Sequence, residues 1–441
     1  MRTVLLLLLA VGCTTEENVG NEPPALLTVT PAVGSARWAI SFGTSTDDFG
    51  MGVAINSIGD VIGVANLAQP LQAGGSAYSL VTQRTAFDGS ERWSTKLTPQ
   101  DAASSVWIRG TAIAPDDSIT VVGTYMGTVD FGGQMLTTAS NVDDAFIATY
   151  DGSGALQSVH GLAGAGTLGA DIYALAIDST GAVVIGGDFE GTLAVGSASY
   201  TSDGTDDDYY LAKLDPSGSV LWSHELGVPL IRSAVIDASD DVWLTGQFTG
   251  TASVGGAVLD ADAYMRGYVS EFRGDGLYLQ SYAVGASDPG ESNAVALATS
   301  STGDVVVDSI DHMPLPALAA PALYAFDDAA TPMWSMTLPY SVSPTLIATA
   351  DGRYASLAWI DGGTTGSFQI ATLDADGSAS TVNYGERDAT SAYNTGIVAS
   401  ATNANGTVAS IGNYAGTIDF GSGPITDSGS GDVFLVLSNS P

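Results

Sequence analysis

Basic residues are scarce in this chain. Its 441 residues include 12 Lys and Arg against 48 Asp and Glu, which gives a formal net charge of −36 at pH 7. Nucleic acids and anionic lipid surfaces are bound through clustered Lys and Arg, so we expect no nucleic-acid partner. A negative field favours cationic ligands or divalent metal ions. The alternative is that the charge only keeps a large β-protein soluble and protects its strand edges.

Residue types that carry catalysis are also few. The chain has 3 His and a single cysteine, Cys13, and it lacks a Gly-x-Ser-x-Gly elbow and a phosphate-binding glycine loop. We therefore predict no catalytic residue, no bound cofactor and no enzyme activity. A hydrolase or lyase stays open as an alternative, because paired carboxylates for glycoside hydrolysis are defined only by their distance in space.

The first residues have the pattern of an export signal. Arg2 precedes the apolar run 4–11, which is too short to span a bilayer. One cysteine cannot form an internal disulfide. The stretch Leu9-Ala10-Val11-Gly12-Cys13 resembles a bacterial lipobox, although Ala10 stands where that motif usually has a larger aliphatic residue. An ordinary signal peptide that happens to contain a cysteine is the alternative.

The resemblance implies three segments and an address. Residues 1–12 are a signal peptide, residues 13–34 a flexible tether acylated at Cys13, and residues 35–441 the folded body. Thr14 is not the aspartate that this motif links to inner-membrane retention. The implied location is the outer membrane or cell surface, with the lipid anchor at Cys13 as the contact with the membrane.

One sequence unit recurs seven times after residue 35, and a period of about 50 residues points to propellers or arrays. Each unit begins with a small apolar run, here called strand A: residues 52–55, 110–113, 174–177, 233–236, 294–297, 346–349 and 396–399. Small residues suit the innermost strand of a propeller, where blades converge. A tight turn and strands B, C and D follow in each unit.

Strand D carries a tryptophan in four units. These are Trp38, Trp93, Trp222 and Trp334, and they align with Ser158, Gln280 and Thr381 in the other three. We interpret the tryptophans as wedges between neighbouring blades, since an aromatic ring buries a large area. His160 and His224 fall at matching D-strand positions, and His312 falls in an irregular loop.

The two ends of the repeat complete each other. The last unit has a C strand at residues 431–438 but no D strand, whereas an orphan D strand, residues 36–43, precedes the first A strand. If this strand completes the final blade, the ring closes without open edges. The predicted fold class is therefore all-β: a seven-bladed β-propeller of four-stranded blades, closed by the N-terminal strand.

Four units share a signature after strand B: GTYMGTVDFGG at 123–133, GDFEGTLAVGS at 187–197, GQFTGTASVGG at 246–256 and GNYAGTIDFGS at 412–422. With this signature the chain resembles the bacterial β-propeller repeat (SBBP-type) lipoprotein family. The resemblance implies a propeller and says almost nothing about function. The turn at residues 214–222 also looks like those of pyrroloquinoline-quinone-type propellers, a group that includes a lipoprotein of outer-membrane assembly.

The connections divide the disc into two faces. The A–B and C–D turns are short and share one face, while the B–C and D–A connections are longer and share the other, the long-loop face. Any ligand is expected there, because binding residues concentrate on loops. Aspartates collect there: Asp47, Asp48, Asp143, Asp144, Asp206, Asp207, Asp208, Asp260 and Asp262. These aspartates leave a calcium site as an open alternative, although the sequence has no EF-hand loop. The nearest fragment, Asp374-Ala375-Asp376-Gly377, is interpreted as a turn.

Two non-enzymatic functions follow. In the first, a monomeric surface propeller recognises a protein or polysaccharide through its long-loop face. In the second, it is a periplasmic scaffold similar to the outer-membrane-assembly propellers. The predicted sites are the same in both cases: lipidation at Cys13, with no catalytic, cofactor or metal residue assigned.

Overall fold

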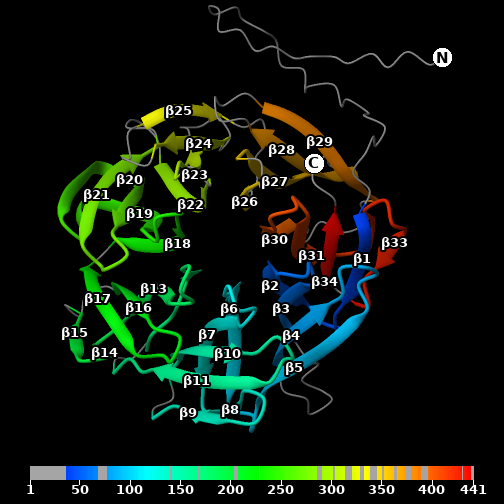
Figure 1. Ribbon diagram of the computed structural model, residues 1–441, viewed down its shortest axis with the longest axis horizontal. Coiled ribbons are helices and arrows are strands. Elements are labelled where there is room, and N and C mark those ends of the chain that lie inside the picture. The colour runs from blue at the N-terminus through cyan, green and yellow to red at the C-terminus, as the bar shows by residue number, and fades with distance from the viewer. Residues whose placement is uncertain are drawn as a thin grey trace, which may run out of the picture.

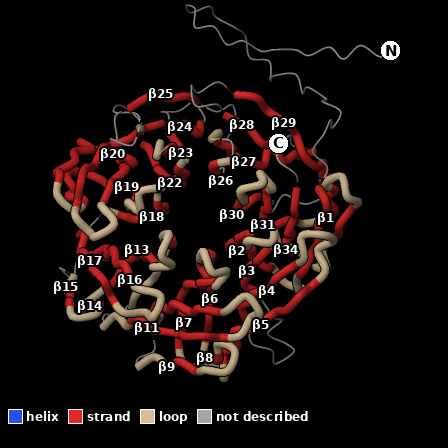
Figure 2. The backbone as a smooth tube through the Cα atoms, viewed as in Figure 1, coloured by secondary structure: helices blue, strands red, loops and turns tan. Residues whose placement is uncertain are grey.

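In the computed structural model, strands surround a central axis and form a flat ring (Figure 1). The structure describes residues 36–67, 77–139, 142–165, 169–202, 207–227, 229–285, 291–300, 303–312, 320–327, 332–337, 345–349, 352–361, 365–373, 379–388, 396–429 and 431–438. In these ranges the elements are strands joined by turns and loops (Figure 2), and no helix there is long and apolar enough to cross a membrane.

The strands form seven four-stranded antiparallel blades, each ordered A, B, C, D from the axis outward. Blade one consists of β2 (Asp48–Ile55), β3 (Val61–Leu67), β4 (Tyr78–Arg84) and β5 (Glu91–Pro99). Blade two consists of β6 (Ser105–Ile113), β7 (Ile119–Met126), β10 (Asp144–Tyr150) and β11 (Leu156–Leu162). Blade three consists of β12 (Ala174–Ile177), β13 (Val183–Phe189), β16 (Asp208–Leu214) and β17 (Val220–Gly227).

Blade four consists of β18 (Leu230–Ile236), β19 (Val242–Val254), β20 (Ala257–Phe272) and β21 (Tyr278–Val284), and blade five of β22 (Glu291–Thr299), β23 (Val305–His312), β24 (Ala320–Phe326) and β25 (Pro332–Thr337). Blade six consists of β26 (Thr345–Ala348), β27 (Tyr354–Asp361), β28 (Thr365–Leu373) and β29 (Ala379–Asp388). Blade seven consists of β30 (Gly396–Thr402), β31 (Val408–Tyr414), β34 (Asp432–Ser438) and β1 (Ala36–Phe42). The predicted A strands and the predicted number of blades are confirmed.

The ring closes through its first and last described strands. β1 pairs antiparallel with β34, with Ala36 opposite Ser438 and Ser41 opposite Phe434. In Figure 1 the blue β1 lies beside the red β34. The two strands share an apolar cluster that includes Phe434 and Val436. The predicted N-terminal closure is confirmed, and it covers an edge that would otherwise be open.

The D-strand tryptophans pack against the next blade. A Cβ added to Gly89, Gly154 or Gly276 would lie within 3 Å of the ring of Trp38, Trp93 or Trp222, respectively. Only glycine fits there, because each of these C–D turns has a positive φ and a ring pressed on its Cα. The pairing of strands C and D confirms that Ser158 and Gln280 occupy the tryptophan position in blades two and four. In blade six the residue at the tryptophan position is Ser380, not Thr381 as predicted. The other D strands have a bulge just before this position, and the D strand of blade six has none, so its register differs by one residue.

The shared signature after strand B forms a small hairpin. The hairpins are β8 (Thr128–Asp130) with β9 (Met135–Thr137), β14 (Thr192–Val195) with β15 (Ala198–Thr201), the extended ends of β19 and β20, and β32 (Thr417–Asp419) with β33 (Pro424–Thr426). Two of them pair with the D strand of the preceding blade, β8 with β5 and β32 with β29. Apolar residues on one side of the hairpins, such as Phe131 and Val254, are fully buried, whereas Met135 and Val258 are exposed. The signature therefore seals the outer seam between blades.

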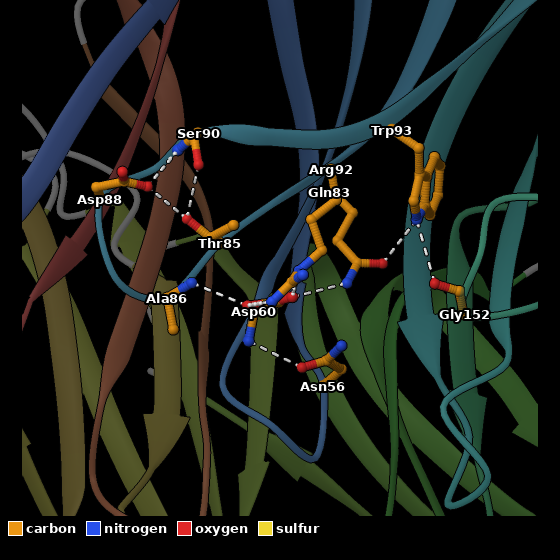
Figure 3. A network of polar contacts seen from close by, with 10 residues as sticks. All are labelled: Asn56, Asp60, Gln83, Thr85, Ala86, Asp88, Ser90, Arg92, Trp93 and Gly152. Atoms are coloured by element: carbon orange, nitrogen blue, oxygen red, sulfur yellow. Dashed lines mark hydrogen bonds and ion pairs between the residues drawn. The ribbon is translucent and has the colours of Figure 1, made fainter.

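A polar network around the buried side chains of Asp60 and Gln83 ties blade one to blade two (Figure 3). Asp60 is 2 % exposed and forms an ion pair with Arg92. Gln83 Nε2 donates to Asp60 at 3.0 Å, and Gln83 Oε1 accepts from Trp93 Nε1 at 2.8 Å. Trp93 Nε1 also lies 3.2 Å from the carbonyl oxygen of Gly152 in blade two. Because each of these polar groups has a partner, the cost of burying them is offset.

The A–B turns are linked from blade to blade by a strained aspartate. Asp117 has φ 65°, where five other blades have glycine at this turn position, and its carboxylate accepts from Ser57 N (2.8 Å) and Ser57 Oγ (2.5 Å) of blade one. The backbone strain costs about 1 kcal/mol, and each hydrogen bond contributes about 1 kcal/mol.

We therefore expect Asp117→Ala to destabilise the protein by about 1–2 kcal/mol, because it loses the hydrogen bonds and keeps the strain. Asp117→Gly should fall between Asp117→Ala and the unsubstituted protein, since glycine relieves the strain. Urea unfolding followed by tryptophan fluorescence measures this order. An Asp117→Gly variant more stable than the unsubstituted protein would show that the interblade hydrogen bonds contribute less than the backbone strain costs.

Candidate functional site

A bulge near the start of most A strands aims a side chain differently from its neighbours. The register shifts at Met51, Arg109, Arg232, Val295 and Val398, in blades one, two, four, five and seven. Tyr173 precedes β12 at the same point of blade three. A bulge adds one residue and bends the strand. The bulge of blade two brings Arg109 beside Tyr173 of blade three, with its guanidinium carbon 5.5 Å from the ring centre.

Tyr173 lines a groove of about 180 Å³ on the long-loop face, between blades two and three, and Arg109 contacts Asp171 in its lining. Loop segments from both blades build it: the ends of the B strands, the starts of the C strands, and the D–A connection. Five acidic residues line the groove: Asp143, Asp171, Asp188, Glu190 and Asp207. Two of the aspartates predicted from the sequence, Asp143 and Asp207, thus meet in one site.

The groove is organised by one ion pair and one tyrosine. Arg109 Nε donates to Asp171 Oδ1 at 3.1 Å, and Arg109 Nη2 contacts the other oxygen of the same carboxylate. Tyr173 Oη donates to Asp188 Oδ2 at 2.9 Å. Arg109 thus compensates one carboxylate directly. Among the described residues, the lining holds five acidic side chains and no lysine or arginine, so the concave site carries a negative formal charge that attracts a cation.

Burial and like charges change the titration of these acids. Burial, with help from Asp171 and Asp207, raises the pKa of Asp188 to about 6, although Tyr173 and Arg109 oppose the shift. Burial also raises the pKa of Asp143, and Asp171 adds to it. The groove therefore gains negative charge as the pH rises through about 6, so cation binding should strengthen over the same range.

The raised pKa of Asp188 predicts a stability change with a definite sign. The folded protein keeps this proton up to about pH 6, whereas the unfolded chain loses it near 3.8. Stability therefore falls as the pH rises from about 4 to about 6. Asp188→Asn can still accept from Tyr173, so we expect it to stabilise the protein by about 1–2 kcal/mol at pH 7.5.

Urea unfolding of Asp188→Asn at pH 4, 5, 6 and 7.5 measures the change. Asp151→Asn is a suitable control, because hydrogen bonds from Ser153 and the backbone lower the pKa of that exposed carboxyl instead. A constant offset between Asp188→Asn and the unsubstituted protein across the series would contradict the assignment.

The other predicted aspartates lie elsewhere. Asp48 is buried at the start of β2 and accepts from Thr44, and Asp144 and Asp208 are buried at the starts of their C strands. Asp260 lies in the blade-four hairpin. Asp47 is an exposed residue of the D–A connection into blade one. The aspartates of the long-loop face therefore do not form one site.

Several predicted features fall outside the described residues: Cys13, Asp206, the turn at 374–377, and the side chain of Asp262. His160 and His224 pair with β10 and β16 at matching D-strand positions, as predicted. His224 Nε2 lies 2.7 Å from the carbonyl oxygen of Gly276. His312 is the last residue of β23 rather than part of a loop, because it pairs with Glu291.

Two further features have the form of a site: an apolar recess and a cluster of three carboxylates. A recess of about 330 Å³ lies among the A strands where they approach the A–B turns, with a mainly apolar lining that includes Leu175, Ile236 and Ile347. Asp237, Asp241 and Glu271 place carboxylate oxygens within 4.8 Å of one another. Protein donors already occupy them: Trp243 Nε1 reaches Asp237 at 3.0 Å. Gly274 N donates a hydrogen bond to Asp241, and Gln280 Nε2 donates one to Glu271.

Five residues at this site were not predicted from the sequence: Asp171, Tyr173, Asp188, Glu190 and Arg109. Asp188 and Glu190 lie inside the signature GDFEG, where they read as part of a repeat rather than as a site. Their position in the repeat could have predicted them. Both lie at the end of a B strand, and the B strands end on the long-loop face. The contribution of Arg109 depends on a bulge, and the repeat pattern does not reveal it.

Comparisons with known proteins give matches among solved structures. No protein-family model matches the chain, and no curated protein matches it in sequence. Among solved structures, the Dos1 propeller matches at 11 % identity and TM-score 0.44, over 92 % of this chain and 96 % of that one. The polysaccharide lyase Uly1 matches at 9 % identity and TM-score 0.48, over 89 % and 90 %.

The β-propeller domain of the Trilobed protease from Pyrococcus furiosus, described as having an open velcro topology, matches at 10 % identity and TM-score 0.45, over 89 % of this chain and 94 % of that domain. At these values the similarity says nothing about activity. The pairing of its own strands identifies this chain as a seven-bladed β-propeller.

Proposed function

We propose that this protein is a non-catalytic binding module, a monomer held at the outer membrane by a lipid on Cys13. It recognises a protein or polysaccharide partner through the long-loop face, and it belongs to the bacterial β-propeller repeat (SBBP-type) lipoproteins. No nucleic acid and no resident cofactor take part. The observation that carries the proposal is the groove between blades two and three, where five acidic side chains meet.

The groove defines the chemistry of the partner. A net negative site of about 180 Å³ accepts one cationic group, such as a lysine or arginine side chain or the amine of an amino sugar. The scaffold is rigid, because four-stranded blades and interblade hydrogen bonds hold the loops that form the groove. The partner is therefore a basic segment of a protein or an amino-polysaccharide.

The test compares two double variants that remove the same charge. Asp143→Asn with Asp207→Asn changes the groove, and Asp215→Asn with Asp275→Asn changes the C–D turns of the opposite face. Chitosan oligosaccharides, dextran and a lysine-rich peptide serve as probes in biolayer interferometry at low salt. We expect the groove variant to bind the cationic probes at least tenfold more weakly than the control variant, and dextran to bind to neither. Equal loss in both variants would refute the groove as the site.

The alternatives have their own outcomes. Protease treatment of intact cells should remove a surface-displayed protein, and protection would favour the periplasmic scaffold. Incubation with a panel of glycans and esters should give no product, and product formation would favour the hydrolase or lyase. Calorimetric titration of chelator-treated protein with calcium should give no heat, and a saturating signal would assign a calcium site.

A further inference from the structure

The chain enters the folded body beside the short turns. β1 begins at Ala36, opposite Ser438, the last residue of β34. In every complete blade these two positions flank the C–D turn, and the C–D turns lie next to the A–B turns. For example, Gly274 N of a C–D turn donates to Asp241 beside an A–B turn at 2.8 Å. The N-terminal end of β1 therefore lies on the short-turn side, away from the acidic groove.

An exposed apolar pair lies close to this entry point. Phe87, in the C–D turn of blade one, is 90 % exposed, and Ile58, in the A–B turn of the same blade, is 66 % exposed. The two turns touch, since a Cβ on Gly59 would lie 3.5 Å from the Cβ of Ala86. Trp38 of β1 docks on the same C–D turn, with Nε1 3.4 Å from the carbonyl oxygen of Ala86.

We propose that the short-turn face is the membrane-proximal face of this protein and that Phe87 and Ile58 contact the lipid bilayer. The inference rests on the proposed acylation of Cys13. It orients the acidic groove of the long-loop face away from the membrane, toward a partner outside.

A lipid surface fits this pair better than a second copy of the chain. Two copies that each carry a net charge of −36 repel one another, whereas a zwitterionic bilayer carries no net charge. The neighbouring Asp88 stays ionised, because hydrogen bonds from Thr85 and Ser90 lower its pKa to about 2. The occupant is therefore a zwitterionic membrane rather than an anionic one.

The anchor makes a small apolar contact sufficient. About 20 residues separate Cys13 from Ala36, and a link of this length keeps the face near the bilayer at an effective concentration in the millimolar range. Under this condition two apolar side chains can hold the face on lipid, although they could not recruit the protein from solution.

The test uses the full-length acylated protein in phosphatidylcholine vesicles. Phe87→Cys and, as the control on the opposite face, Ser45→Cys each receive an environment-sensitive fluorophore. Ser45 is an exposed residue of the D–A connection into blade one. Acylation of Cys13 leaves the introduced thiol as the single labelling site. We expect the label at position 87 to shift to the blue and to be quenched by a headgroup-attached quencher several-fold more strongly than the label at position 45.

The outcomes separate the two proposals. Protein that fails to float with vesicles would overturn the anchor and this inference together. Protein that floats but shows equal quenching at both positions, or stronger quenching at position 45, would overturn the orientation and leave the anchor intact. Adding Ile58→Ser to Phe87→Cys should reduce the quenching, and unchanged quenching would remove Ile58 from the contact.

Discussion

A chain that lacks residues 36–43 should lose its soluble monomeric form. β1 supplies the outer strand of blade seven, and without it β34 becomes an open edge along its full length. That edge belongs to a strand whose residues are all buried, including Phe434 and Leu435. Exposed edges of this kind pair with other chains. Size-exclusion chromatography with light scattering should show aggregates in place of a monomer.

A peptide of residues 35–43 added in trans provides the control. It should restore the monomer, because it can occupy the vacant edge, and the same peptide with Trp38→Ala should restore it poorly. In the intact chain, Trp38→Ala removes a ring that is 5 % exposed and should cost about 3–5 kcal/mol. A truncated chain that stays monomeric and unfolds at the same temperature as the intact chain would contradict the role of β1.

Lys213→Ala should be the most destabilising single charge substitution. Lys213 and Asp178 are both 4 % exposed in their side chains and form an ion pair of 2.8 Å. Lys213 Nζ also donates to the carbonyl oxygen of Gly274 at 3.1 Å, so it joins blade three to blade four. Removing Lys213 leaves the buried Asp178 carboxylate without its counter-ion, which costs about 3–5 kcal/mol. Urea unfolding at pH 7.5 measures the loss.

The double variant Lys213→Met with Asp178→Asn controls for lost packing and should recover most of the stability, because neither charge then remains buried. Burial acts to raise the pKa of Asp178, but hydrogen bonds from Lys213, Thr180 and the backbone outweigh it and lower that pKa. The pair therefore stabilises the fold at neutral pH, and this stability is lost as the pH falls below the usual aspartate range. If the double variant is as unstable as Lys213→Ala, packing rather than charge explains the effect.

The sequence allowed the ring to be predicted because its rules are local and repeated. Small apolar A strands recur at each unit, and the orphan strand with Trp38 matches the missing strand of the last unit. The pairing of Ser41 with Phe434 confirms that match. The shift from Thr381 to Ser380 shows the limit of the method, since a bulge moves the register by one residue without any change in composition.

The groove could be predicted only in part. Asp143 and Asp207 immediately precede the C strands β10 and β16, so the repeat places them on the long-loop face. Their meeting with Asp171 depends on how the D–A connection crosses between blades, and this path has no repeated pattern. Arg109 reaches Asp171 from a bulge 62 residues earlier in the chain. Contacts between blades of this kind follow from the closed ring and not from any single unit.

The most direct test of the closed ring is a disulfide between its first and last described strands. Ala39 lies opposite Val436, and both pack in the same apolar cluster. Directly opposed Cα atoms in an antiparallel pair are about 4.5–5.5 Å apart, which suits a disulfide. Under mild oxidation, Ala39→Cys with Val436→Cys should give a cross-linked peptide by mass spectrometry. Ala39→Cys with Val398→Cys, at the opposite edge of the blade, should not. Cross-linking of the second pair, or failure of the first in a folded monomer, would contradict the closure.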